Sequence, residues 1–252
     1  MMFTPRHLLT PPVRYLKVKM KAEEQWEAEE YMAVLNERQE KIFKELMDRY
    51  PALKAVGGDI LEVYGILEEC YERGGRLLIA GNGGSCADAE HIVGELMKGF
   101  VKHRKLEAEL QDQLRAEDEE NGARLAECLQ RGLPAIALNG HPGLSTAFAN
   151  DVDADMVYAQ QVCGYGEEGD VFLGISTSGN AKNIDYAVTV AKAKGMKVIG
   201  LTGKDGGKLA RRAHAAVVAP EQETFKIQEM HLPIYHVLCL LLEERFFGEE
   251  KS

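Results

Sequence analysis

The stretch RLLIAGNGGSCADAEHIVGEL, residues 76–96, passes from a short apolar run through a glycine cluster into a helical pattern. The run RLLIA has the length and composition of a buried strand. The small residues after it allow a backbone to approach a ligand closely, and the first N–H groups of a helix attract anions. The stretch therefore predicts a strand, then an anion-binding loop, then a helix.

Four further apolar runs resemble RLLIA, and helical patterns separate them. Short buried strands that alternate with helices are typical of a parallel sheet covered on both faces. Right-handed crossovers then give a doubly wound α/β fold, a three-layer αβα sandwich with a five-stranded parallel sheet. The expected strands are 76–80, 134–138, 170–176, 197–203 and 215–219, and the expected helices are 86–99, 144–163, 180–194, 206–213 and 222–246.

The segments before the first strand predict a tail and two helices. Residues 1–20 are basic and contain three prolines, without the apolar core of a signal peptide, so we expect a tail. Apolar residues at helical spacing predict helices over 21–50 and 58–73. This N-terminal region, 21–74, is expected to pack on the main domain, 75–248, or on a neighbouring subunit.

One segment within the main domain does not fit the alternation of strands and helices. Residues 101–133 are highly charged, and Leu106, Leu110 and Leu114 recur every four residues. The pattern predicts an inserted amphipathic helix followed by a second piece that contains Leu125 and Leu129. We expect the insertion to face solvent or another subunit, with a lid over the site as the alternative.

The composition excludes several classes of protein. The 252 residues carry a formal net charge of -10, which disfavours binding to nucleic acid or to an anionic membrane. No apolar run approaches the roughly 20 residues that a membrane span needs. The five cysteines are odd in number and form no CxxC pair, so we expect buried free thiols in a reducing cytoplasm.

Two predicted strands end in loops of the same chemistry. Asn82, Gly83 and Ser85 belong to the loop after 76–80, and STSGN, residues 176–180, follows the strand 170–176. The carboxyl ends of parallel strands meet at one sheet edge, where N–H groups and hydroxyls together can surround a phosphate. Each loop alone is compatible with an ordinary turn, but the two together favour a phosphate site.

Two other nucleotide-binding motifs do not match. Cys86 stands where the third glycine of a GxGxxG dinucleotide fingerprint belongs, and Leu209 follows Lys208 where a P-loop requires serine or threonine. Both observations disfavour nicotinamide and ATP chemistry.

Polar residues on two helices form a possible metal site. His91 and Glu95 are four residues apart and share a helix face, which suits a shared metal ion or a simple surface hydrogen bond. Gln228, His231 and His236 lie on an otherwise apolar helix and need a reason to be buried there. A core histidine bonded to a carbonyl is one such reason.

These motifs in combination resemble the phosphoheptose isomerase group of the sugar isomerase (SIS) domain family, which has a flavodoxin-like fold. GNGGS with Asp88, His91 and Glu95, then GISTSGN, KGMKVIGLTGKDGGKLA and IQEMHLPIYH, carry the resemblance from residue 76 to about 245.

The resemblance implies the activity, the cofactor and the site residues. It implies conversion of sedoheptulose 7-phosphate to D-glycero-D-manno-heptose 7-phosphate through an enediol(ate), in a homotetramer whose active sites lie between subunits. It also implies zinc. The implied zinc ligands are His91, Glu95, Gln228 and His236, and the implied substrate contacts are Asn82, Gly83, Ser85, Asp151, Ser176, Thr177, Ser178 and Gln228.

An aldose–ketose isomerisation needs a base near carbon and an acid near oxygen, and a cation would stabilise the enediolate charge. We assign these roles to Glu95 and His236, in either order, and expect one of them to leave the metal during turnover. Ala181 and Phe225 depart from the family pattern. Two alternatives therefore stay open, namely isomerisation of a different sugar phosphate and a non-catalytic SIS module that senses a sugar phosphate or binds a protein.

Overall fold

Five parallel strands form one sheet in the order β2-β1-β3-β4-β5. The structure is a computed structural model that describes residues 35–248. One continuous register row crosses the sheet from Ala137 through Ile79, Leu173 and Ile199 to Ala215. All five predicted strands are present. Their bounds are β1 Leu77–Gly81, β2 Ala135–Ala137, β3 Val171–Ser176, β4 Lys197–Thr202 and β5 Ala215–Val218.

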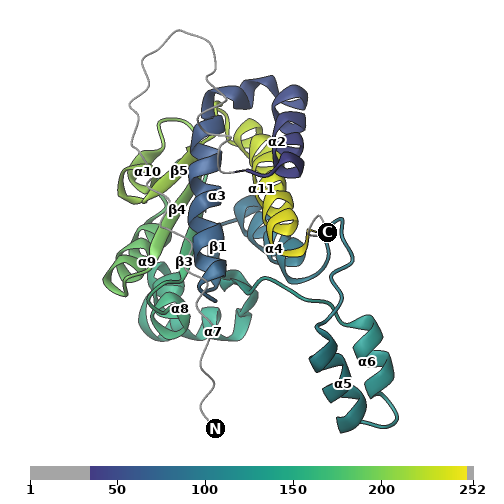
Figure 1. Ribbon diagram of the computed structural model, residues 1–252. Coiled ribbons are helices and arrows are strands. Elements are labelled where there is room, and N and C mark those ends of the chain that lie inside the picture. The colour runs from purple at the N-terminus through teal and green to yellow at the C-terminus, as the bar shows by residue number, and fades with distance from the viewer. Residues whose placement is uncertain (1–34, 249–252) are drawn as a thin grey trace.

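Helices cover both faces of this sheet, as the strand sequences require (Figure 1). Successive side chains of a strand point to opposite faces, so Ile79 packs with α3, α4 and α11 while Leu78 packs with α8 and α9. Both faces are buried, which confirms the three-layer αβα sandwich. The covering helices are α3 Gly57–Glu72, α4 Gly84–Met97, α8 Val157–Tyr165, α9 Lys182–Ala193, α10 Gly207–Arg212 and α11 Thr224–Phe247.

The first described helix, α2 (Glu37–Arg49), starts much later than the predicted 21–50. Asn36 begins the helix with a capping box, because its side chain accepts from the Gln39 N–H and the Gln39 side chain accepts from the Asn36 N–H. The Gln39 amide also donates to the Leu241 carbonyl at 3.0 Å, which ties α2 to α11. A 3-10 turn, Pro51–Val56, leads into α3. The predicted tail 1–20 and the start of the predicted helix lie outside the described residues.

The prediction of one helix over 144–163 is wrong. The chain forms α7 (Pro142–Phe148), a π-helical turn (Ala149–Asp153), a 3-10 turn (Ala154–Met156) and then α8. Asp153 causes the break, because its backbone is extended and its carboxylate accepts from the Asp155 N–H at 2.8 Å. Aspartate side chains compete with helical hydrogen bonds in this way.

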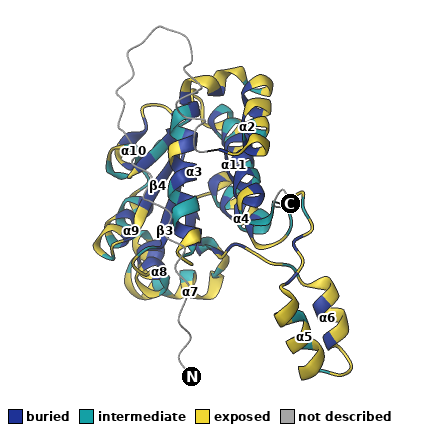
Figure 2. Ribbon diagram, viewed as in Figure 1, coloured by how far each residue is buried: buried dark blue, intermediate teal, exposed yellow. Residues whose placement is uncertain are grey.

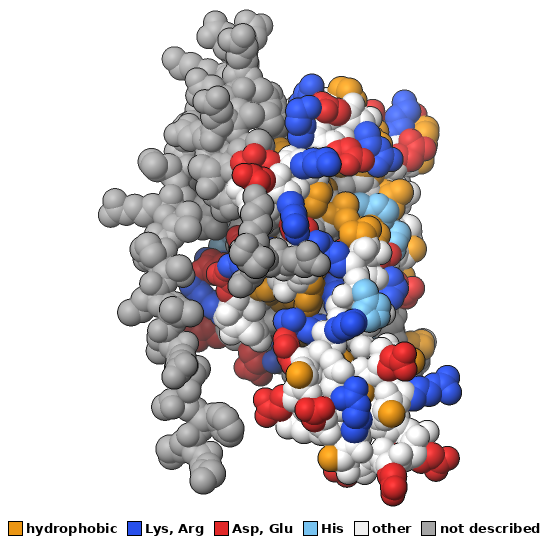
Figure 3. Space-filling model, turned by 45° about the vertical axis from the view of Figure 1, so that its right-hand side comes forward, with side chains coloured by type: hydrophobic (Ala, Val, Ile, Leu, Met, Phe, Trp, Pro, Cys, Tyr) orange, Lys and Arg blue, Asp and Glu red, His pale blue; other side chains and the backbone are white. Residues whose placement is uncertain are grey.

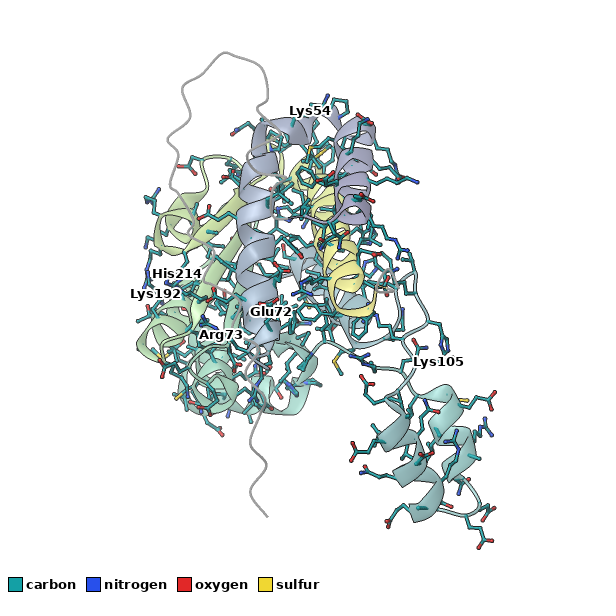
Figure 4. All side chains as sticks on the ribbon, viewed as in Figure 1. Lys54, Glu72, Arg73, Lys105, Lys192 and His214 are labelled. Carbon is teal, nitrogen blue, oxygen red and sulfur yellow. The ribbon has the colours of Figure 1, made fainter. Side chains whose placement is uncertain are left out.

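The insertion is a helical hairpin that projects from the body (Figures 1 and 2). Its helices are α5 (Ala108–Glu117) and α6 (Gly122–Cys128), so the predicted two pieces are present. The stalk is pinned by an antiparallel bridge between Lys105, labelled in Figure 4, and Gln130. It leaves the body between the end of α4 and the start of β2. This is the amino-terminal edge of the sheet, so the hairpin does not cover the loops at the carboxyl edge of its own chain.

A buried ion pair anchors the hairpin stalk to the body. Arg104 Nε donates to Glu243 of α11 at 2.8 Å, and neither side chain is exposed to solvent. The same guanidinium donates to the carbonyls of Leu96 and Glu95, which satisfies two acceptors near the end of α4. Arg104 therefore links the stalk, α4 and α11 at a single point.

The expectation of five buried cysteines is only partly right. All five thiols are free, but only Cys70 and Cys239 are buried, while Cys128 and Cys163 are exposed. Cys128 is exposed because it lies at the end of α6 in the projecting hairpin, where little of the body packs against it.

Candidate active site

The strand order brings the two glycine-serine loops to the same place. From β1 the chain crosses to β2 on one side, and from β3 it continues to β4 on the other, so the order reverses between β1 and β3. Ligands of open α/β sheets bind at such a switch point, beyond the carboxyl ends of the strands. The loops after β1 and β3 flank this position, as the sequence predicted.

The first loop is a tight turn built on glycine. Gly83 has a backbone φ of +56°, which residues other than glycine rarely adopt, and it is the N-cap residue of α4. The N–H groups of Ser85 and Cys86 donate back to the carbonyls of Asn82 and Gly83, both at 3.0 Å. The turn uses these two donors, so we expect anion contacts from the Ser85 hydroxyl and from the N–H groups earlier in the loop.

Asn82 connects this loop to the helix that follows the second one. Its side-chain amide and that of Asn183 in α9 donate to each other, at 3.0 and 2.9 Å. The reciprocal pair fixes the spacing of the two loops across the switch point. Asn183 was not among the predicted site residues, because its pairing depends on the order of the strands in space.

The second loop is held by glycines of the third. Gly179 has φ of +63°, and a Cβ there would lie 2.0 Å from the Gly206 carbonyl oxygen. The Gly179 carbonyl accepts from the Leu209 N–H at 2.9 Å. This backing leaves Ser176 buried and Thr177 and Ser178 half-buried in front of the helix start. The three hydroxyls of residues 176–178 are therefore clustered in one turn, apart from Ser85 in the first loop.

Three of the four predicted metal ligands gather between α4 and α11. The His91 Nε2 atom lies 3.2 Å from Glu95 Oε1, and the His91 and His236 rings meet edge to face with centroids 5.0 Å apart. Hydrophobic and histidine side chains lie together on the face of the molecule that Figure 3 turns forward. Glu95 is mostly buried, while the His91 side chain is 42% exposed and accessible to a ligand.

The fourth predicted ligand, Gln228, lies apart from the other three. Helices α4 and α11 run side by side in the same direction, so Gln228 lies near Gly84 while His236 lies near His91. A Cβ at Gly84 would be 2.4 Å from the Gln228 amide nitrogen. Gln228 is therefore next to the first loop rather than beside the histidines.

The types of side chain in this group are ones that bind zinc, although the four do not surround a single position. Within residues 35–248 no three His, Cys, Asp or Glu side chains are placed to hold an ion together. The buried Nε2 atom of His236 has no hydrogen-bond partner, and such orphaned atoms are rare in proteins. Two ligands of a tetrahedral zinc ion lie about 3.3 Å apart, close to the His91–Glu95 separation.

The charges around His236 favour a neutral imidazole. Burial lowers the pKa of His236, and the neighbouring His91 lowers it further, while Glu95 raises it. The neutral ring is the form that binds a metal or passes a proton between its two nitrogens. By contrast, His231 is fully buried with Nε2 3.1 Å from the Thr202 carbonyl, and burial lowers its pKa to about 4. It is the core histidine that the sequence allowed for.

Two residues behind the histidines were not predicted to have a role in the site. The Tyr235 hydroxyl lies 2.9 Å from His91 Nδ1, and Asp88 lies one turn before His91 on α4. Burial raises the pKa of Asp88 to about 6, against the opposing effect of Tyr235 and His91. Tyr235 directly precedes His236, so only the packing of α11 on α4 reveals that it faces His91.

Asp151 hydrogen-bonds within its own turn. It lies on the exposed π-helical turn Ala149–Asp153, where its carboxylate accepts from the Asn150 side chain at 2.8 Å. None of the hydrogen bonds found among residues 35–248 joins it to either loop. Its predicted contact with substrate therefore stays a prediction.

The chain is similar to known proteins over the region that contains both loops. The family model described as SIS domain matches residues 119–203. The phosphoheptose isomerase of Nitratiruptor sp. is 38% identical over 211 residues, which cover 82% of this chain and 99% of the relative. That of Aneurinibacillus thermoaerophilus is 39% identical over 179 residues, covering 71% of this chain and 77% of the relative.

Two solved structures share the fold. The phosphoheptose isomerase of Neisseria gonorrhoeae has a TM-score of 0.63 and 31% identity, and covers 82% of this chain and 98% of its own. The phosphoheptose isomerase of Francisella tularensis has a TM-score of 0.64 and 30% identity, and covers 82% of this chain and 97% of its own. The likeness therefore spans nearly the whole length of both neighbours.

Proposed function

Because the chain belongs to the phosphoheptose isomerase family of SIS-domain proteins, and is thus an aldose–ketose isomerase, we propose that it converts sedoheptulose 7-phosphate to D-glycero-D-manno-heptose 7-phosphate. The observation that carries the proposal is the pairing of the two glycine-serine loops at the switch point with His91, Glu95 and His236 on the helices beside them.

The loops hold the phosphate in this proposal. Ser85, Ser176, Thr177 and Ser178 supply hydroxyls, and Asn82 and Gly83 shape the turn. The rigid contact of Gly179 with Gly206 fixes the second loop before substrate arrives. Such preorganisation places the sugar end at a constant distance from the phosphate.

Glu95 and His236 move the protons. The Glu95 carboxylate takes the C1 proton of the ketose and returns it to C2, and the enediol forms between the two transfers. The His236 imidazole donates a proton to O2 and then takes the O1 proton at the same nitrogen, so the ring ends neutral. Its lowered pKa suits this exchange, since a neutral ring has both a donor and an acceptor.

His91, Glu95, Gln228 and His236 would hold zinc, which supplies Lewis-acid stabilisation of the substrate oxygens when bound. Gln228 reaches the set only if its side chain turns away from Gly84. His91 serves as a ligand alone in this proposal, because its Nδ1 atom is already engaged by Tyr235.

We also propose a cytoplasmic homotetramer with its active sites between subunits. The site is open on this chain, since the His91 side chain is 42% exposed and Phe225, at the start of α11, is 56% exposed. In this assembly Asp151, which lies on an exposed turn, would contact the substrate. In the part of the chain that the structure describes, no helix is long and apolar enough to cross a membrane.

Turnover of sedoheptulose 7-phosphate by the purified, zinc-loaded protein tests the substrate. We expect heptose 7-phosphate to form, and activity to disappear with a chelator and return with zinc, because the donor set holds a removable ion. The assay includes shorter ketose phosphates, since Ala181 and Phe225 depart from the family pattern. If only a shorter ketose phosphate is converted, that sugar phosphate is the substrate instead. If the protein binds a ketose phosphate but converts none of them, the non-catalytic sensor is favoured.

Replacing Gly84 by alanine is expected to impair the site without unfolding the protein. The new Cβ would lie 2.4 Å from the Gln228 amide, so that side chain must move. Misplacement of this kind costs about 10- to 100-fold in kcat/KM. Gly94→Ala on the same helix is the control, since nothing lies within 4 Å of its Cβ. Equal kcat/KM in both variants would contradict the position of Gln228.

A further inference from the structure

The projecting hairpin, α5 with α6, has almost no core of its own. Its helices have 10 and 7 residues, and isolated helices shorter than about 12–15 residues are marginal in water. No residue of α5 is buried, and Leu110, Leu125 and Leu129 remain 43%, 38% and 47% exposed. We therefore expect the hairpin to gain stability by packing against another surface.

The charge of the hairpin indicates which kind of surface fits it. Residues 107–128 contain two arginines and eight acidic residues, of which seven are exposed, so a partner must supply positive charge. The acidic residues are Glu107, Glu109, Asp112, Glu117, Asp118, Glu119, Glu120 and Glu127.

One face of the body has the opposite charge pattern. Residues 182–214 form α9, β4 and α10 and contain eight basic residues against two aspartates, and we call this region the basic face. Its two helices are joined, because Arg212 pairs with Asp185 and the Lys192 ammonium donates to the Arg212 carbonyl at 2.7 Å. The basic residues are Lys182, Lys192, Lys194, Lys197, Lys204, Lys208, Arg211 and Arg212.

The basic face presents part of this charge to solvent. No ion pair found within residues 35–248 involves Lys192, Lys197 or Arg211, and all three residues are exposed. Burial lowers the pKa of the His214 ring, and the nearby Lys197 and Lys192 lower it further, as happens where cations gather. These cations are therefore available to an acidic partner.

The hairpin and the basic face of one chain lie on opposite sides of the body. Helices α5 and α6 are at the lower right of Figure 1, whereas α9 and α10 are at the left. Figure 4 likewise shows Lys105 of the hairpin stalk on the right and Lys192 and His214 on the left. The two complementary surfaces can therefore meet only between copies of the chain.

We propose that the hairpin of one subunit docks on the basic face of a second copy of this chain. The aliphatic stems of the lysines and arginines cover the exposed leucines of the hairpin, while their charged ends pair with its carboxylates. A two-fold axis makes the contact reciprocal, so that each copy gives its hairpin and receives the other. The inference goes beyond the proposed function, because it uses residues outside the site and does not depend on the isomerase activity.

The exposed thiol of Cys128, at the end of α6, provides a probe for this contact. A Cys163→Ser background removes the other exposed thiol. A crosslinker with a maleimide on Cys128 and an amine-reactive ester should then capture lysines of the basic face in a second chain. We expect a covalent dimer on a denaturing gel, with its crosslinks located within residues 182–208 by mass spectrometry. The dimer should decrease in 1 M salt, where the Debye length is about 3 Å.

Charge reversal tests whether the two surfaces recognise each other. Lys192→Glu/Arg211→Glu should lose most of the crosslinked dimer. The control Lys41→Glu/Lys44→Glu makes the same change in charge on exposed residues of α2 and should keep the dimer. Adding Glu109→Arg/Asp112→Arg in the hairpin to Lys192→Glu/Arg211→Glu should restore the dimer, because the attraction is then reversed in sign on both sides.

Three results overturn the proposal: no dimer through Cys128 in the parent protein, crosslinks that lie only in other segments, or a dimer that Lys192→Glu/Arg211→Glu leaves unchanged. Recovery of the dimer in the four-residue variant shows that the loss was not caused by misfolding. Failure of the proposed function gives a different result. If the dimer behaves as expected but no ketose phosphate is converted, the docking of the hairpin stands and the assigned activity does not.

Discussion

Glu95→Gln should lower kcat by about 10²- to 10⁴-fold, which is the usual contribution of a positioned general base. The amide keeps the size of the carboxylate but cannot accept the C1 proton. Glu95 is mostly buried and its carboxylate lies 3.2 Å from His91 Nε2, beside the proposed metal ligands. The measurement is steady-state turnover of sedoheptulose 7-phosphate at saturating zinc, with the bound metal quantified in the same samples.

Two comparisons make this result specific. Glu69→Gln removes a carboxylate that pairs with Arg73 on the surface, far from the metal ligands in sequence, and should leave kcat unchanged. Zinc titration shows whether the loss comes from the metal or from the base, since a purely metal-related loss recovers at high zinc. Full activity in zinc-loaded Glu95→Gln would remove Glu95 from the proton transfer.

Arg104→Met should cost about 3–5 kcal/mol in the free energy of unfolding, the range found when one partner of a buried ion pair is removed. Arg104 and Glu243 are both fully buried, and among residues 35–248 the carboxylate then keeps the N–H donors of Phe100 and Val101. The substitution also leaves the Leu96 and Glu95 carbonyls without their guanidinium donor. Such a loss is a large part of a typical domain stability of about 5–15 kcal/mol.

Urea unfolding measures this loss in the free energy of unfolding. Two further variants show how much of it comes from the buried charge. Arg115→Met breaks an exposed pair with Asp112 in the hairpin and should cost less than about 1 kcal/mol. The double variant Arg104→Met/Glu243→Gln removes the unpaired charge and should be more stable than Arg104→Met alone. If Arg104→Met is as stable as Arg115→Met, the buried pair does not anchor the stalk.

The sheet could be predicted from the sequence because each strand is buried on both faces. Such strands are continuous apolar runs, as in 170–176 and 197–203, and the turns after them contain the small residues that the loops need. The sequence alone therefore predicts both loops at one edge of the sheet. The fold follows largely from local patterns of this kind.

Features that depend on one side chain or on packing could not be predicted in the same way. Asp153 breaks a long helical pattern with a single side-chain hydrogen bond, which hydrophobic periodicity does not reveal. Tyr235 and Asn183 become part of the site only through the register of α11 on α4 and the order of β1 and β3. His91 and Glu95 were predictable as a pair because their spacing is contained within one helix.

The bridge between Lys105 and Gln130 places the beginning and the end of the hairpin at adjacent points on the body. A segment whose ends already meet can lengthen, shorten or be exchanged with little entropic cost to the remainder of the chain. Because the hairpin leaves from the sheet edge opposite the two glycine-serine loops, we expect changes in α5 and α6 to leave those loops undisturbed within the same subunit. The family fold thus offers at this position a tolerant site for evolutionary growth, and for the grafting of a reporter or a tether.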